Sequence, residues 1–267
     1  MTSLEQKAAL IRYRIMEVSH KNKIPHLASS FSCVDILTAL YSEVLNISLE
    51  TSTHENRDRL ILSKGHAASA LYTTLAEFGF LKSDILYTHG EKDSPLEEHP
   101  SRNCIPGVET ATGSLGHGLP IACGLALAAK IKSMPYQTYT ILGDGECNEG
   151  TIWEAAMFAS AQKLDNLCVF VDFNKWQATG RSKEVMYLDP LADKFSSFGW
   201  NTVEIDGHSM KEILDSVNQR KQNSRPTAII AHTVKGKGVS FTEDDNNWHY
   251  RIPKQEELVE AKKELGV

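Results

Sequence analysis

Short apolar runs alternate with longer helical patterns along the whole chain. Short runs with β-branched and other apolar residues predict strands at 59–63, 139–142, 167–171, 201–205 and 227–231, of which the first is expected to be buried. Apolar spacing of three to four residues predicts helices at about 3–20, 34–45, 67–79, 119–131, 149–164 and 188–198, another ending near Gln222, and a polar helix from Lys254. This alternation is typical of an α/β fold with a doubly wound, mainly parallel sheet and helices on both faces. We expect one domain, 1–267.

Three local patterns refine these elements. Ser3 and Gln6 form a capping-box pattern that predicts where the first helix begins. The helix at 119–131 has apolar or small residues nearly all round, which predicts a fully buried helix, either inside the core or at a subunit interface. The segment 89–117 is irregular, and an irregular segment of this length in a compact domain is usually functional or disordered.

Two polar side chains follow neighbouring predicted strands. Asp144 comes directly after the run 139–142 and Gly143, and Asn174 closely follows the run 167–171, with a predicted helix between the runs. A strand, helix, strand crossover places both side chains at one edge of the sheet, where open α/β sheets bind ligands. Carboxylate and amide oxygens suit Mg²⁺ or Ca²⁺, and Mg²⁺ usually completes its shell with phosphate and water oxygens. The pattern therefore indicates a metal that carries a phosphorylated ligand.

Other glycines and histidines lie at strand ends and in loops. Gly143 and Gly145 would let a phosphate approach the backbone near a helix N-terminus. The stretch ATGSLGHG at 111–118 has the order G-x-x-G-x-G, which is not a dinucleotide fingerprint, and no Walker lysine pattern occurs. Taken singly, the histidines favour structural or surface roles.

Composition narrows the functional class. The chain has 28 basic and 34 acidic residues, a formal net charge of -6 and no basic block, which argues against nucleic acid as a partner. No apolar run approaches the roughly 18 residues of a membrane span, and the N-terminus is an amphipathic helix pattern and not a signal peptide. Five cysteines without a CxxC pair argue for reduced thiols and against zinc. We expect a cytoplasmic protein.

Several segments together resemble one family. GDG at 143–145 is followed, after 28 residues, by Asn174, a spacing that resembles the thiamine-diphosphate motif. KIPHLASSFSCVDILTALY, SKGHAASALYTTLAE, HPSRN, ATGSLGHGLPIACGLALA, DGH and TVKGKG occur in the order and spacing of the amino-terminal, diphosphate-binding half of transketolase. The resemblance runs from about residue 5 to 250 and implies the thiamine-diphosphate-binding fold.

The resemblance also implies a set of site residues. The metal, Mg²⁺ or Ca²⁺, would be held by the side chains of Asp144 and Asn174 and by the backbone carbonyl of Trp176. The residues expected to face the thiazolium and the substrate are His26, His99 and His249. The remaining cofactor-binding residues would be His66, Gly113, Leu115, Gly145, Glu149 and Glu154, of which the two glutamates would reach across a subunit interface. His117 and His208 are interpreted as structural.

The implied function is transfer of a two-carbon ketol unit from a ketose phosphate to an aldose. In the family, a glutamate on a pyrimidine-binding domain activates the cofactor, and we expect that domain, with the C-terminal one, on a partner chain in an α₂β₂ assembly. Alternatives are the α subunit of a 2-oxo acid dehydrogenase, the related deoxyxylulose phosphate synthase and a non-catalytic interaction subunit. Pro25 and Ala28 stand beside His26 where the family commonly has glycines, which makes this loop stiffer. The acceptor sugar and the pathway stay open.

Overall fold

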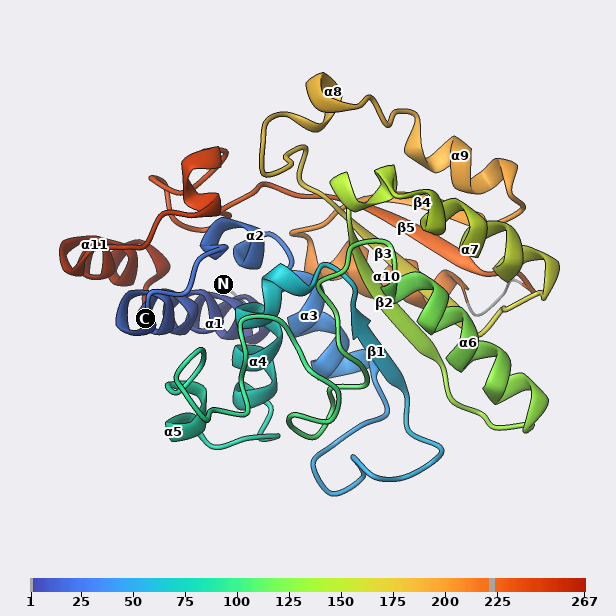
Figure 1. Ribbon diagram of the computed structural model, residues 1–267, viewed down its shortest axis with the longest axis horizontal. Helices are drawn as coiled ribbons and strands as arrows, with labels where there is room; N and C mark the ends of the chain where they lie inside the picture. The colour runs from blue at the N-terminus through green and yellow to red at the C-terminus, as the bar shows by residue number, and fades with distance from the viewer. Residues whose placement is uncertain (1, 221–223) are drawn as a thin grey trace.

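The computed structural model describes residues 2–220 and 224–267, which contain one five-stranded sheet. Its strands are β1 (Arg59–Leu62), β2 (Thr138–Gly143), β3 (Leu167–Phe173), β4 (Asn201–Asp206) and β5 (Thr227–His232). All pairs are parallel and the order is β1-β2-β3-β5-β4 (Figure 1). The five predicted strands and the α/β fold are therefore confirmed. The first three strands lie side by side in chain order, starting from the edge strand β1. The chain then forms the opposite edge strand, β4, and β5 lies between β3 and β4.

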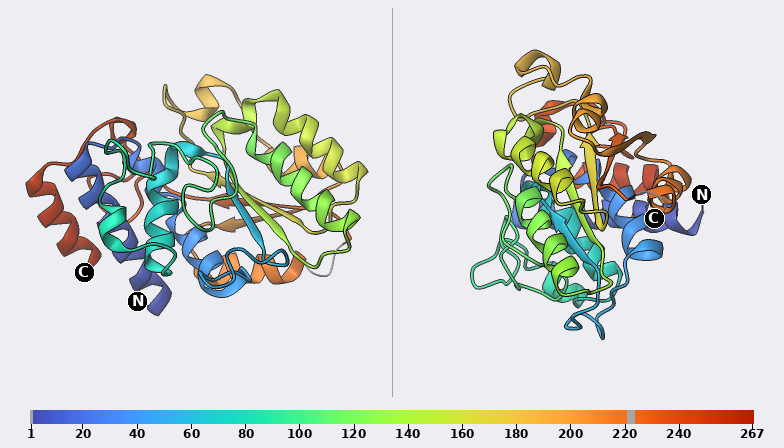
Figure 2. Two further views of the ribbon diagram at one scale, coloured as in Figure 1. Left: turned by 60° about the horizontal axis from the view of Figure 1, so that its bottom comes forward. Right: turned by 90° about the vertical axis from the view of Figure 1, so that its right-hand side faces the viewer.

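Two helical layers cover opposite faces of this sheet, as Figure 2 shows. One layer consists of α6 (Gly118–Ile131), α7 (Gly150–Ala161) and α9 (Leu191–Ser197). The other contains α1 (Ser3–Asn22), α3 (Val34–Ala39), α4 (Ala68–Glu77) and α10 (Met210–Arg220), with α11 (Gln255–Leu265) packed on α1. Successive side chains of each strand point to alternate layers: Leu60 and Leu62 join the core of the second layer, and Ile61 joins that of the first.

The short helices lie near the carboxyl ends of the strands or in connections. They are α2 (Leu27–Phe31), a π-helical turn at Leu40–Val44 that extends α3, α5 (Ser83–Leu86) and α8 (Ser182–Val185). The segment 87–117 contains neither helix nor strand, as expected. Among the helices that the structure describes, none is long and apolar enough to cross a membrane.

Two predicted boundaries were wrong. The capping box is formed by Thr2 and Glu5, because the Thr2 hydroxyl accepts from the Glu5 N–H at 3.3 Å and the Glu5 carboxylate accepts from the Thr2 N–H at 2.8 Å. The helix predicted at 188–198 begins only at Leu191, since Pro190 lacks an N–H and disfavours helical backbone in the residue before it. The predicted helix end at Gln222 lies outside the described residues.

Helix α6 is not buried on all sides within this chain. Leu119, Ala122 and Ala126 pack against the sheet. Ile131 on the same helix is 74% exposed, and no described residue comes within 4 Å of a Cβ built at Gly124. The prediction of a fully buried helix is therefore wrong for the chain by itself, and an apolar outer face remains open.

Candidate active site

A cleft of about 410 Å³ lies at the carboxyl ends of β1, β2 and β3. It is lined by every site residue predicted from the sequence except Glu154, which is exposed on α7 one turn beyond Glu149. The irregular segment 87–117 brings His99, Gly113 and Leu115 into the cleft. Residues far apart in the sequence thus converge on one cavity.

The predicted metal ligands lie at one end of this cleft. Asp144 directly follows β2 and is buried; one of its carboxylate oxygens accepts a hydrogen bond from the Ser182 hydroxyl at 2.6 Å. Asn174 directly follows β3, and its amide oxygen accepts from the Trp176 N–H at 3.1 Å. Burial raises the pKa of Asp144 to about 6. A carboxylate that is costly to ionise without a positive partner fits a site that receives a cation.

The donor set also indicates which cation complex would fit. Within the described residues, no group of three or more His, Cys, Asp or Glu side chains is placed to hold a metal ion. One carboxylate, one amide oxygen and one backbone carbonyl leave most of a Mg²⁺ octahedron to be filled by water and by phosphate oxygens. The site therefore suits a metal that arrives with a phosphorylated ligand.

Two glycines leave room for side chains of neighbouring segments that line the cleft. A Cβ on Gly145 would lie 2.7 Å from the Cγ atom of Gln177. Gly113 has a φ of +130°, and a Cβ there would lie 2.7 Å from the His99 ring. Any side chain at these positions would displace groups that line the cleft, so these loops require glycine.

Three histidines surround His26 in the cleft. The ring centroid of His26 lies 4.9 Å from that of His249, 5.4 Å from His66 and 6.2 Å from His99. Burial, together with nearby positive groups, lowers the pKa of His26 to about 4, that of His249 to about 3, and that of His66 well below its usual value. These three rings are therefore neutral near pH 7 and act as hydrogen-bonding groups, not as cations.

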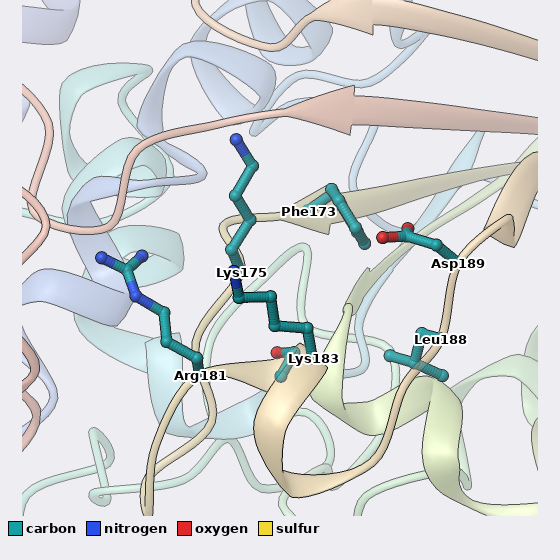
Figure 3. Close-up of a pocket in the computed structure, with 7 residues that line it drawn as sticks. Phe173, Lys175, Arg181, Lys183, Leu188 and Asp189 are labelled. Carbon is teal, nitrogen blue, oxygen red and sulfur yellow. The ribbon is translucent and has the colours of Figure 1, made fainter.

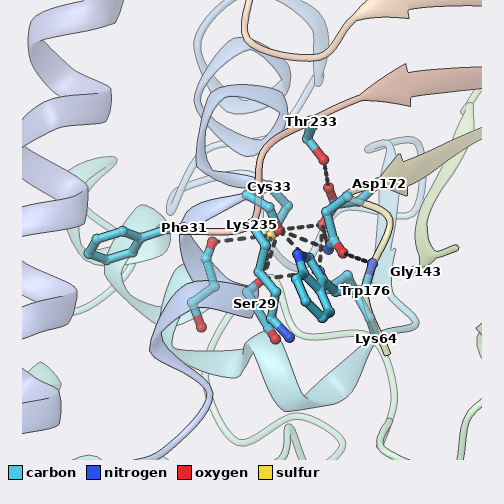
Figure 4. A network of polar contacts seen from close by, with 12 residues as sticks. Ser29, Phe31, Cys33, Lys64, Gly143, Asp172, Trp176, Thr233 and Lys235 are labelled. Carbon is cyan, nitrogen blue, oxygen red and sulfur yellow. Dashed lines mark hydrogen bonds and ion pairs between the residues drawn. The ribbon is translucent and has the colours of Figure 1, made fainter. Parts of the chain in front are cut away.

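A buried ion pair lies next to the predicted metal ligands. It was not predicted from the sequence. Lys64 and Asp172 form an ion pair and are 1% and 0% exposed. The Asp172 carboxylate also accepts from the hydroxyls of Ser32, at 2.6 Å, and Thr233 (Figure 4). Burial opposes ionisation of both partners, but their mutual attraction raises the pKa of Lys64 and lowers that of Asp172. The one signal in the sequence is a single aspartate inside the otherwise apolar strand β3.

A second buried lysine has no such carboxylate. Lys235 is 1% exposed, and its ammonium group donates to the Asn246 side-chain oxygen at 2.6 Å and to His249 Nδ1 at 3.0 Å. Across residues 2–220 and 224–267, no carboxylate lies within 4 Å of it. Burial and the positive charge of Lys64 lower the pKa of Lys235 to about 8. The charges of Asp144, Asp172 and Asp245 offset this effect only in part, so a buried cation without a direct carboxylate contact lies behind the histidines and favours an anion in the cleft.

Glu146, also missed from the sequence, fixes the loops around the cleft. Its buried carboxylate accepts from the N–H of Gly116 at 2.9 Å, from the N–H of Gly143 at 3.0 Å and from the Ser63 hydroxyl. These partners belong to three separate segments, which follow β1, precede α6 and end β2. One side chain therefore sets the relative positions of three segments around the cleft.

A smaller pocket of about 170 Å³ lies beside the cleft (Figure 3). It is lined mainly by Phe173, Leu188 and the stems of Lys175 and Lys183. Arg181 at its edge is paired with Asp244 at 2.6 Å and lies over the Trp176 ring. None of the predicted site residues lines this pocket, so the candidate chemistry belongs to the larger cleft.

Known proteins similar to this chain include subunits of transketolases. One apulose-4-phosphate transketolase subunit, from Phocaeicola vulgatus, is 40% identical over 265 residues, which is 99% of this chain and 94% of that protein. A 6-deoxy-6-sulfo-D-fructose transketolase subunit from a Clostridium species is 42% identical over 241 residues, 90% of this chain and 88% of that protein. The crystal structure of transketolase from Campylobacter jejuni superposes with a TM-score of 0.93 at 29% identity.

The chain covers the two subunits almost completely but only part of the single-chain enzyme. All of it aligns with the Campylobacter jejuni transketolase, of which it spans 43%. The family model described as "Transketolase, thiamine diphosphate binding domain" matches residues 4–267. The chain therefore belongs to the transketolase N-terminal family of thiamine-diphosphate-binding domains.

Proposed function

We propose that this chain is the diphosphate-binding subunit of a two-chain transketolase, which transfers a two-carbon ketol unit from a ketose phosphate to an aldose. The observation that carries the proposal is the cleft, which brings Asp144 and Asn174 together with neutral histidines, while the buried Lys235 ammonium lies behind His249. The near-complete coverage of relatives named as subunits supports a two-chain enzyme. We place it in the cytoplasm.

The cleft has the groups needed to hold thiamine diphosphate with Mg²⁺, and Ca²⁺ would suit the same oxygen donors. Asp144, Asn174 and the Trp176 carbonyl would bind the metal, while His66 and Gly145 would lie at the diphosphate. Gly113 and Leu115 would flank the aminopyrimidine end of the cofactor. When bound, the cofactor supplies a nucleophilic thiazolium carbon that stabilises the transferred two-carbon fragment.

The chain's own histidines would orient the sugar and move its protons. His249 Nδ1 faces the Lys235 ammonium at 3.0 Å and must accept there, so the His249 proton lies on Nε2. Nδ1 of His26 has no hydrogen-bond partner among the described residues and lies 3.7 Å from a Glu98 carboxylate oxygen. Neutral rings of this kind can donate to and accept from the hydroxyl and carbonyl oxygens of a ketose, and His99 lines the same cleft.

The open face of α6 and α7 is proposed to contact a partner subunit that carries the pyrimidine-binding domain and its glutamate. Met157 and Phe158 on α7 are exposed beside the apolar outer face of α6. Glu149 at the cleft mouth and Glu154 on α7 are exposed in the same region. A patch of this kind next to an active site is typical of a subunit contact. We propose an α₂β₂ assembly, in which Glu149 and Glu154 face the partner.

The substrate class follows from the relatives and from the charge of the cleft. The two relatives are named for apulose 4-phosphate and for 6-deoxy-6-sulfo-D-fructose, which are both anionic ketoses. An anionic ketose donor is accordingly proposed for this chain, with an aldose acceptor.

Native mass spectrometry of the chain with its co-purifying partner, with and without thiamine diphosphate and Mg²⁺, tests the proposal. We expect a heterotetramer that gains two cofactors and transfers ketol units. Asp144→Ala should abolish metal-dependent cofactor binding, whereas Asp165→Ala, which removes a partly exposed carboxylate paired with Lys130, should leave it unchanged. A homodimer without partner or cofactor would instead support a non-catalytic interaction subunit, and turnover of a 2-oxo acid would support the dehydrogenase alternative.

A further inference from the structure

A buried chain of hydrogen bonds runs from helix α1 to the loop after β5, away from the cleft lining. The Arg12 guanidinium donates to both Asp35 carboxylate oxygens, at 3.0 and 2.6 Å. His208 Nδ1 lies 2.6 Å from Asp35, and His208 Nε2 accepts from the Val234 N–H at 2.8 Å. Arg12 and Asp35 are each 5% exposed, so water competes little for these bonds.

These contacts determine which ring nitrogen of His208 carries a proton. The Val234 N–H can only donate, so Nε2 must be the unprotonated acceptor. Asp35 can only accept when ionised, and the Arg12 charge and the His208 hydrogen bond, which outweigh burial, lower its pKa to about 2. The proton therefore lies on Nδ1, and both nitrogens are used. An imidazole held at both ends cannot rotate without losing two hydrogen bonds.

The segment that His208 holds carries two groups of the proposed site. Thr233, just before Val234, donates its hydroxyl to Asp172, and Lys235, just after it, contacts His249. Figure 4 shows both side chains at the buried network. The segment then turns at Gly236, whose N–H donates to the Ala28 carbonyl at 3.0 Å. The Val234 backbone is thus the point from which Thr233 and Lys235 are placed.

We propose that His208 is a positioning residue: held by Asp35 and Arg12, it fixes the Val234 backbone and thereby places the Lys235 ammonium behind His249. The interpretation of His208 as merely structural is replaced by this role. Its effect on cofactor binding rests on the proposed function, whereas the placement of Lys235 does not.

The chain offers a matched control. His232 closes β5 and pairs with Glu204 at 2.6 Å, but these side chains are 41% and 56% exposed and hold no backbone group of the site. His232→Gln therefore removes a histidine and carboxylate contact at the neighbouring position without releasing Val234.

The first experiment follows acetic anhydride labelling of single lysines by mass spectrometry in the full chain. Lys235 and Lys64 should be protected, and Lys211, which is 85% exposed, should label rapidly. In His208→Ala, Lys235 should label about tenfold faster, equivalent to about 1.4 kcal/mol of easier local opening. Lys64, anchored by Asp172, should change less, and His232→Gln should match the parent chain. Unchanged protection of Lys235 in a folded His208→Ala chain would overturn the proposal.

Two amide variants test the hydrogen bond itself and replace His208→Ala if that variant does not fold. His208→Asn keeps an N–H near the Nδ1 position for Asp35 but has no acceptor at the Nε2 position. His208→Gln can place its amide oxygen near Nε2 and accept from Val234. We expect Asn to expose Lys235 and Gln to restore part of its protection; the reverse order would contradict the role assigned to Nε2.

Cofactor binding by the chain with its partner gives a separate result. We expect the apparent Kd for thiamine diphosphate with Mg²⁺ to rise about tenfold in His208→Asn, and less in His208→Gln. If the parent complex binds no cofactor, the proposed function fails, yet the labelling of Lys235 still decides the positioning role. If the parent binds and His208→Asn exposes Lys235 without changing the Kd, Lys235 has no part in holding the cofactor.

Discussion

Two lysines lie equally buried at the same edge of the sheet, and they differ in what surrounds their charge. Lys64 forms an ion pair with Asp172, which is itself held by Ser32 and Thr233. The hydrogen-bond partners of the Lys235 ammonium group are the side-chain amide oxygen of Asn246 and the neutral ring of His249. Consequently the pKa of Lys64 is raised, whereas that of Lys235 is lowered to about 8.

This difference separates a structural charge from a functional one. A buried ion pair with its remaining hydrogen bonds satisfied has little to gain from a ligand. A buried cation without a carboxylate partner is costly to the free protein and is stabilised when an anion arrives. We therefore expect Lys64 to support the base of the cleft and Lys235 to favour binding of an anion there. Substitution of each lysine and changes of pH test this difference.

The largest expected effect is that of Lys64→Met. This change leaves the Asp172 carboxylate buried without its cation, and breaking a buried pair in this way costs about 3–5 kcal/mol. Urea unfolding of the chain should show this loss in the free energy of unfolding. Lys211→Met, at a largely exposed i,i+4 pair, is the control and should leave the free energy of unfolding nearly unchanged. Equal stability of Lys64→Met and the parent would remove the distinction between the two lysines.

The pH dependence of stability should also differ between the lysines. The folded pKa of Lys235 is about 8 and its ordinary value is 10.5, so the unfolded chain binds this proton more tightly. Stability contributed by this group therefore rises between pH 8 and about pH 10, by about 2 kcal/mol. For Lys64 the folded pKa is raised, so its contribution is present below 10.5 and is lost above it.

The measurement compares unfolding free energies of the parent with those of Lys235→Met at pH 8 and pH 10. Groups that titrate in both chains cancel in this difference. A difference that stays constant with pH would mean that Lys235 keeps its ordinary pKa in the folded chain.

A change of intermediate size is expected from Thr233→Val. The Thr233 hydroxyl donates to Asp172, and loss of one hydrogen bond to a charged group costs about 1.5 kcal/mol while the side-chain shape is kept. Thr138→Val is the matched control, since the Thr138 hydroxyl is buried without a hydrogen-bond partner in the described part of the chain. That control should be neutral or slightly stabilising when both variants are compared by urea unfolding.

The central strands were predictable because a buried parallel strand is a nearly continuous apolar run, whereas the edge strand β4 is mostly half-buried and carries alternating polar residues. β2 and β3, for example, are buried at every position. The short helices α2 and α8 were not predicted, because four or five residues carry too little periodicity and are fixed by contacts with other segments. The capping box was misplaced by one residue, since Thr2 and Ser3 are both suitable caps.

Some residues of the candidate site were likewise predictable from the sequence, and others were not. Asp144 and Asn174 were predictable because each follows a strand, and parallel strands bring their ends to one edge. Lys64 and Asp172 are 108 residues apart, and their pairing depends on which strands become neighbours and on which way each side chain points. Lys235 stands in the TVKGKG segment, but the segment does not reveal its burial or that no carboxylate among the described residues lies within 4 Å of its ammonium group.

The smallest stability effect, and the one that tests the contrast most directly, is that of Lys235→Met at neutral pH. Removing an uncompensated buried charge relieves its desolvation, while His249 Nδ1 loses one donor, so we expect a net gain of about 1 kcal/mol in the free energy of unfolding. Affinity of the chain and its partner for thiamine diphosphate with Mg²⁺ should fall about tenfold, since the anion loses a buried cation. Stability and binding thus change in opposite directions, whereas Lys64→Met should lower both. If Lys235→Met destabilised the free chain as strongly as Lys64→Met, Lys235 would be a structural charge as well, and the anion-binding role assigned to it would have to pass to other groups of the cleft.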